Sequence, residues 1–148
     1  MTTPDHYELV ALDHVQLAMP PGGEAEAEAF YCGVLGLDLI PKPDPLAARG
    51  GCWFRGGQVE VHLGVEADFR PARKAHPAFR VRKLDQLVGR IEASGRSFRW
   101  DTELPVVRRG YVDDPFGNRV ELIDADSQRG HADNQRAGTD TQGAATQG

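Results

Sequence analysis

Three histidines and one glutamate occupy matching positions in two similar halves of the chain, and their types suit metal binding. They are His14, His62, His76 and Glu121. Each lies where polar and apolar residues alternate, which is the pattern of a strand with one buried face. Three imidazoles and one carboxylate suit a catalytic divalent metal ion that still has room for water or substrate. The residues therefore predict a small metalloenzyme and leave its substrate open.

The spacing of these residues indicates an internal duplication. From His14 to His62 is 48 residues (62 − 14), and from His76 to Glu121 is 45 (121 − 76). In both halves the pattern predicts a strand, a helix and three further strands. A near-equal period with the same order of elements is typical of two copies of one unit.

The two copies are expected at about residues 8–65 and 75–125, within one domain of residues 1–126. Residues 127–148 contain no bulky apolar side chain, so we expect a disordered tail. His131 lies in this tail and is not expected to bind metal.

Periodicity and turn residues give the expected elements of each half. The first half predicts a strand at 10–19, a helix around 27–34, a strand at 37–40, a proline-rich loop at 41–45, and strands at 51–55 and 58–65. The second half predicts a strand at 76–81, a helix at 84–91, extended segments at 97–101 and 106–112, and a last strand at 119–123.

The dipeptide Gly56-Gly57 predicts a tight hairpin and thereby the faces of two strands. A two-residue turn there pairs Phe54 with Val59 and Trp53 with Glu60. The face turned to the helices then carries Phe54, Val59, Val61, Leu63, Phe79, Val81, Val120 and Leu122. The opposite face carries Trp53, Arg55, Glu60, Arg119 and the four candidate ligands. Agreement across four strands is the strongest sign of a shared site.

Four segments of the chain resemble the vicinal oxygen chelate superfamily, which includes glyoxalase I, extradiol dioxygenases and bleomycin-binding proteins. They are Leu12-Asp13-His14-Val15, residues 30–37 (FYCGVLGL), His76-Pro77-Ala78-Phe79 and residues 114–122 (DPFGNRVEL). The resemblance implies an α+β fold in which two βαββ units form a cup-shaped mixed sheet, the glyoxalase-like fold. It also implies a metal held by the first and last strands of each unit, at His14, His62, His76 and Glu121, and a homodimer.

His62 departs from the bacterial glyoxalase I pattern, which usually has a carboxylate at this position. One anionic ligand in place of two leaves a more electropositive centre, which favours binding of an enolate-like oxygen. Glu60 and Glu121 are the carboxylates expected to take part in catalysis, with Glu60 as the candidate base. Glu60 also suits a place in the pocket wall.

Other residues have two interpretations each. Trp53 suits stacking on a planar substrate or filling the floor of the sheet. Arg119 suits contact with a substrate anion or orientation of the Glu121 carboxylate. Arg108 and Arg109 are expected at a solvated rim, and Asp114 to Asn118 are expected to form a turn.

The leading hypothesis is a lyase or isomerase in which one divalent ion (Zn, Ni, Mn or Fe(II)) chelates neighbouring oxygens of a small substrate. An alternative is an extradiol-type dioxygenase with Fe(II) bound by His14, His76 and Glu121, since two histidines and one carboxylate form the usual triad of such enzymes. An alternative of another class is a drug- or metabolite-binding protein without catalytic activity.

Composition excludes several classes of function. The formal net charge is −5, and the arginines form no stripe, which argues against binding to nucleic acid. No apolar run approaches the roughly 20 residues needed to span a bilayer. The N-terminus has no basic-then-apolar signal pattern, so we expect a cytoplasmic protein.

Overall fold

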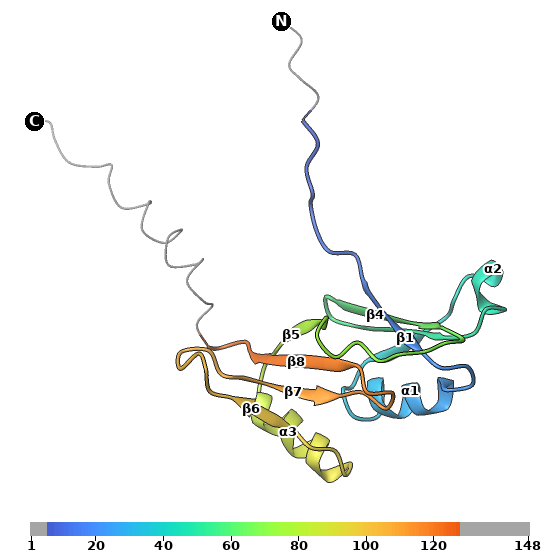
Figure 1. Cartoon of the computed structure of the whole chain (residues 1–148). Coiled ribbons are helices and arrows are strands. Elements are labelled where there is room, and N and C mark those ends of the chain that lie inside the picture. The colour runs from blue at the N-terminus through green and yellow to red at the C-terminus, as the bar shows by residue number, and fades with distance from the viewer. Residues whose placement is uncertain (1–5, 128–148) are drawn as a thin grey trace, which may run out of the picture. The chain divides into compact units, whose positions relative to one another are not determined.

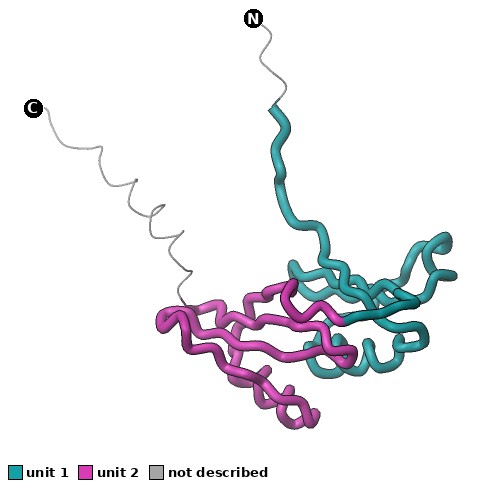
Figure 2. The backbone as a smooth tube through the Cα atoms, in the orientation of Figure 1, with its two compact units in different colours: residues 1–70 teal, residues 71–148 magenta. Residues whose placement is uncertain are grey.

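Each half of the chain forms a four-stranded mixed sheet with a helix packed on one face (Figure 1). A computed structural model describes residues 6–127 of the 148-residue chain. The chain divides after Arg70 into two compact units (Figure 2). The expected tail and His131 lie outside the described residues, apart from Ser127. The α+β class with two repeated units is confirmed.

Unit 1 contains β1 (Val15–Met19), α1 (Glu24–Tyr31), β2 (Asp38–Ile40), α2 (Asp44–Ala47), β3 (Cys52–Gly56) and β4 (Val59–Val65). The strand order is β1-β4-β3-β2. β1 runs parallel to β4, and the other neighbours are antiparallel.

Unit 2 contains β5 (Ala78–Val81), α3 (Leu84–Ala93), β6 (Arg99–Asp101), β7 (Arg109–Asp113) and β8 (Arg119–Asp124). Its order, β5-β8-β7-β6, repeats that of unit 1, with β5 parallel to β8. In both units the first and last strands therefore lie side by side, so residues far apart in sequence meet.

The core of unit 1 lies between α1 and the helix-facing side of its sheet. Phe30, Tyr31, Phe54 and Val61 are fully buried. The rings of Tyr31 and Phe54 stack with centroids 5.2 Å apart. Glutamates in the first turn of α1 favour this helix, because they lie near the positive end of its dipole.

The core of unit 2 lies between α3 and the central strands. Ile91 of α3 and Val112, Val120 and Leu122 of the sheet are at most 1% exposed. Phe79 and Val81, expected in this core, are only half-buried because β5 is an edge strand. That part of the prediction is wrong.

The β3–β4 hairpin turns one residue later than predicted. Its central residues are Gly57 and Gln58, and Gly56 pairs with Val59. Gly57 has φ +57°, which suits the first central position of a type II′ turn. Each β3 residue therefore pairs with a β4 residue two positions later than predicted; Trp53, for example, pairs with His62 rather than Glu60. The predicted pairs are wrong, but a shift of two positions leaves each residue on its predicted face.

Several boundaries also differ from the expectation. β1 begins at Val15 rather than at residue 10, and β5 begins at Ala78 rather than at residue 76. His14 and His76 therefore precede their strands. The expected proline loop contains the short helix α2, for which Pro43 is the N-cap and Pro45 lies in the first turn. None of the helices within residues 6–127 has the length and apolar character to span a membrane.

The β2–β3 pair offers a matched test of the unit 1 core. Leu39 and Phe54 are direct cross-strand partners, but Leu39 is 49% exposed and Phe54 is fully buried. We expect Phe54→Ala to lower the free energy of unfolding by about 3–5 kcal/mol, measured by urea denaturation. Leu39→Ala, the control, should cost less than about 1 kcal/mol. Equal losses would contradict the described packing.

Candidate functional site

Three aromatic rings stack on the sheet face of unit 1 that the helix does not cover. The imidazole of His62 lies between that of His14 and the indole of Trp53, with centroid distances of 4.0 Å on both sides. The Trp53 pair is almost parallel, at 4° between planes. The two neighbouring rings leave His62 only 5% exposed. Two predicted ligands, His14 and His62, thus lie side by side.

Glu60 lies on the same face and binds two of its neighbours. Its Oε1 is 2.8 Å from Nε2 of His62, and its Oε2 accepts a hydrogen bond from Nε of Arg55 at 2.9 Å. These hydrogen bonds to His62 and Arg55 hold the pKa of the Glu60 carboxyl below its usual range. The carboxylate is therefore ionised at neutral pH but is a weaker base than a free glutamate. Glu60 also occupies Nε2 of His62, one of the two ring nitrogens able to bind metal.

The second pair of predicted ligands meets in unit 2. Nε2 of His76 lies 2.9 Å from Oε2 of Glu121, and Nδ1–H of His76 donates a hydrogen bond to the Lys74 carbonyl at 2.8 Å. Glu121 is 6% exposed. A buried carboxylate needs partners, and His76 supplies one of them.

Arg109 supplies the other partner of Glu121. Its Nη1 donates to Oε1 of Glu121 at 3.0 Å, and its Nη2 donates to Oδ2 of Asp101 at 2.8 Å. The Arg109 side chain is 19% exposed, so the expectation of a solvated rim is wrong for this residue. The alternation of Arg109, Tyr111 and Asp113 along β7 is the sequence signal that places it on the Glu121 face. Orientation of Glu121 is therefore the role of Arg109 rather than Arg119.

Tyr111 connects the site residues of unit 2. It is the cross-strand partner of Glu121, and its ring meets the imidazole of His76 edge to face, with centroids 5.6 Å apart. Burial, followed by the nearby Glu121 carboxylate, raises the pKa of the Tyr111 phenol. The guanidinium of Arg119 lies over the same ring, 5.3 Å from its centroid.

The His76–Glu121 pair has a nitrogen–oxygen separation that is compatible with two ligands of one divalent ion. Two ligands that bind one ion at about 2.1 Å lie about 3 Å apart. The 2.9 Å between His76 Nε2 and Glu121 Oε2 matches this spacing. Among residues 6–127, no three His, Cys, Asp or Glu side chains gather as one metal-binding group. The predicted set is found as two pairs, one within each unit.

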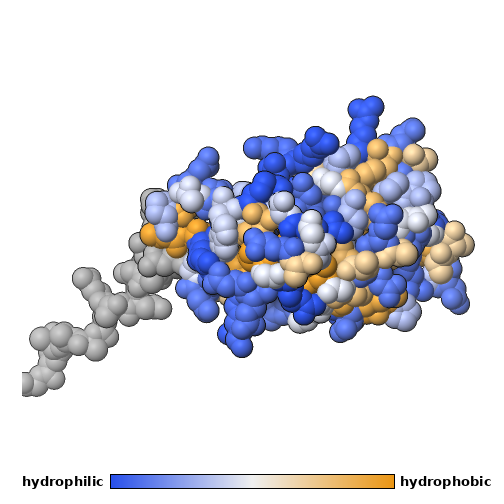
Figure 3. All heavy atoms as spheres, turned by 90° about the horizontal axis from the view of Figure 1, so that it is seen from below, coloured by the Kyte–Doolittle hydropathy of each residue, from blue (hydrophilic) through white to orange (hydrophobic). Residues whose placement is uncertain are grey.

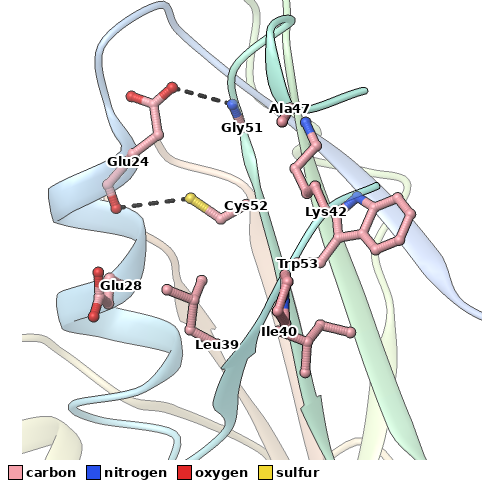
Figure 4. Close-up of a pocket in the computed structure, with 10 residues that line it drawn as sticks. Glu24, Glu28, Leu39, Ile40, Lys42, Ala47, Gly51, Cys52 and Trp53 are labelled. Carbon is pink, nitrogen blue, oxygen red and sulfur yellow. Dashed lines mark hydrogen bonds between the residues drawn. The ribbon is translucent and has the colours of Figure 1, made fainter. Parts of the chain in front are cut away.

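A pocket of about 410 Å³ opens in unit 1 between α1 and the end of β2 (Figure 4). Trp53 lines it, so this residue is available both to the pocket and to the His62 stack. Glu24 holds one wall, because its Oε1 accepts the Gly51 N–H at 3.1 Å. Burial raises the pKa of the Cys52 thiol to about 11, which keeps it protonated and unreactive.

Hydrophilic residues predominate on the face shown in Figure 3, with smaller hydrophobic areas between them. The net charge of −5 leaves no excess of basic groups over the whole chain.

The sequence model of the Glyoxalase/Bleomycin resistance protein/Dioxygenase superfamily matches residues 11–122, which is most of the chain. A solved structure from Bacillus anthracis that is assigned to the glyoxalase family is 47% identical. The alignment covers 80% of this chain and 98% of that one, with a TM-score of 0.78. No curated protein matches the chain.

Two more distant structures share the fold. Lactoylglutathione lyase from Agrobacterium tumefaciens is 20% identical, with 74% of this chain and 91% of that chain covered and a TM-score of 0.57. An antibiotic binding protein from a Streptomyces species is 19% identical, with 80% and 98% covered and a TM-score of 0.62. At these identities the likeness concerns the fold alone, since one fold supports both catalysis and binding.

The acid side of the stability profile tests the contacts of Glu60. The unfolded carboxyl titrates near 4.5, its ordinary value, and the folded one below it. Its contribution to stability is therefore present above the unfolded pKa and is lost as the pH falls through the folded pKa. We expect the urea midpoint of Glu60→Gln to fall less than that of the wild type between about pH 5 and pH 3. Glu26→Gln, the control, removes the same charge from an exposed position on α1 and should not reproduce this change. Identical pH profiles of the urea midpoint for Glu60→Gln and the wild type would refute the contacts of Glu60 with His62 and Arg55.

Proposed function

Because the chain belongs to the Glyoxalase/Bleomycin resistance protein/Dioxygenase superfamily, we propose that it is a metal-dependent enzyme of the lyase or isomerase type acting on a small oxygenated substrate. The observation that carries the proposal is the His76–Glu121 pair, whose nitrogen and oxygen are 2.9 Å apart on a buried, polar sheet face. His14 and His62 complete the proposed ligand set from unit 1. The proposal assigns the activity to residues 1–126 and includes a homodimer and a cytoplasmic location.

A divalent ion at these residues would supply a Lewis acid that stabilises negative charge on a substrate oxygen. The chain's own residues contribute the rest. Arg109 holds Glu121 in place through Oε1, which leaves Oε2 to His76 or to the ion. The partners of Glu60 keep it ionised, so it is able to accept a proton from a bound substrate, although its lowered pKa limits its strength as a base. Trp53 offers a flat apolar surface next to His62.

A second candidate function is an extradiol-type dioxygenase. The observation that favours it is the bond between Glu60 and Nε2 of His62, at 2.8 Å. If this bond persists, His14, His76 and Glu121 remain as a set of two histidines and one carboxylate, which suits non-haem Fe(II). Oxygen uptake with a catechol as substrate would favour this candidate over the lyase or isomerase.

Metal content tests the proposed ligand set directly. We expect tag-free protein, purified without chelator, to contain stoichiometric divalent metal by elemental analysis, and His14→Ala and His62→Ala each to lose it. His6→Ala, which removes an exposed histidine before β1, should retain the metal of the wild type.

The other outcomes separate the candidates. Loss in His14→Ala but not in His62→Ala would leave the three-residue set and favour the dioxygenase. Absence of metal in every sample, even after reconstitution with Zn, Ni, Mn or Fe(II), would contradict an enzyme of this type and favour a binding protein without catalytic activity.

A further inference from the structure

A cavity of about 370 Å³ in unit 2 has a strongly basic lining. Its walls are formed by Arg73, Arg99, Asp113, Gly117 and Arg119. Three guanidinium groups and one carboxylate give this small space a net positive charge, whereas the chain as a whole carries −5. Such a local reversal of sign attracts and concentrates anions.

Two of the three arginines have no acidic partner. Arg99 is bound to Asp113, with Nη2 and Oδ1 2.9 Å apart. Within residues 6–127, neither Arg73 nor Arg119 forms an ion pair. By contrast, Arg108 and Arg109 both contact carboxylates. The contact of Arg119 with the Tyr111 ring uses its positive charge and leaves N–H donors for an oxygen acceptor.

A buried hydrogen-bond network joins the backbone segments that carry the two arginines. Asn118 is fully buried, and its Oδ1 accepts the backbone N–H of Ala72 at 2.9 Å. The carbonyl of Ala72 in turn accepts the N–H of Arg119 at 2.9 Å. Asp114 closes the turn below them by accepting the N–H groups of Phe116 and Asn118. These bonds join the backbone at Ala72, next to Arg73, to the backbone at Arg119, so the two arginines start from adjacent points of the chain.

The cavity lies next to the proposed metal ligands on the same sheet face. Arg119 and Glu121 are two residues apart on β8, so their side chains point to the same side and their Cα atoms are separated by about 7 Å. Tyr111, the cross-strand partner of Glu121, contacts both Arg119 and His76. A ligand that extends from the cavity along this face past Tyr111 would place its other end beside His76 and Glu121.

We propose that Arg73 and Arg119 form an anion subsite that binds a carboxylate or phosphate group of the substrate. This inference rests on the proposed function, because it defines the substrate class as a short acid whose anionic group binds next to the proposed metal ligands. Arginine suits this role since its planar fork matches the oxygens of both groups.

The test uses metal-free, isotope-labelled full-length chain, so that it does not depend on the metal. Inorganic phosphate and acetate are titrated separately at constant ionic strength, and amide chemical shifts are followed by NMR. We expect saturable shifts at Arg73, Gly117 and Arg119. Arg119→Gln and Arg73→Gln should each weaken binding about tenfold, the loss expected for one charge-assisted hydrogen-bonding group.

Arg82→Gln is the matched control, because it removes an equal charge from an exposed position of unit 2 outside the cavity. It should leave binding unchanged. Tighter binding of phosphate or of acetate would assign the group as phosphoryl or carboxylate, and either supports the subsite. Shifts that do not saturate, or equal weakening in all three variants, would overturn it. If the purified protein contains metal but shows no saturable anion binding, this inference alone is refuted. If it contains no metal but binds anions saturably, the proposed function alone is refuted.

Discussion

Parallel pairing of the first strand with the last holds each unit together and brings its candidate ligands into contact. In unit 1, β1 and β4 pair Gln16 with His62, and His14 lies two residues before Gln16. In unit 2, β5 and β8 pair Ala78 with Glu121, and His76 lies two residues before Ala78. Parallel strands need a long crossover, which contains α1, β2, α2 and β3 in unit 1 and α3, β6 and β7 in unit 2. A slip of one residue in either pair would turn His62 or Glu121 into the core.

Burial of one face makes the other face polar by necessity. Val120 and Leu122 pack under α3, so the residues between and beside them on β8 point away from the helix. A half-buried carboxylate on that face needs a cation, and each unit provides an arginine from the neighbouring strand: Arg55 for Glu60, and Arg109 for Glu121. These ion pairs hold the carboxylates in position but contribute little to the free energy of unfolding, as is usual for ion pairs near the surface.

The arginines of unit 2 differ in the partners of their guanidinium groups. Arg109 contacts two carboxylates and orients Glu121, whereas Arg119, among residues 6–127, contacts an aromatic ring and no carboxylate. The turn from Asp114 to Asn118, whose residues alone indicate no more than a turn, positions Arg119 and the loop that carries Arg73. The turn thereby positions residues of the proposed anion subsite.

Much of the fold follows from local pattern. Alternation along the strands predicts which side of the sheet each of Phe54, His62, Val120 and Glu121 occupies, because the side-chain period of a strand is two. This holds even where the predicted pairing is wrong, since the β3–β4 register is displaced by an even number of positions. The predicted hairpin turn lies one residue too early, because Gly56 and Gly57 both suit a turn. Gly56 pairs with Val59 in the ladder, and a Cβ atom there would meet the Leu37 side chain at 2.7 Å, so close packing requires glycine at this strand position.

The sequence by itself determined the class of fold, the duplication, the polar face of each sheet and the residue types able to bind metal. Each of these depends on periodicity or on composition, which are local properties of the chain. Only the tertiary structure decided which groups touch: that Glu60 binds His62, that Arg109 rather than Arg119 holds Glu121, and that Arg73 joins Arg119 around one cavity. Those contacts join residues on different strands and loops, and their partners are selected by strand register and burial, which no local pattern specifies.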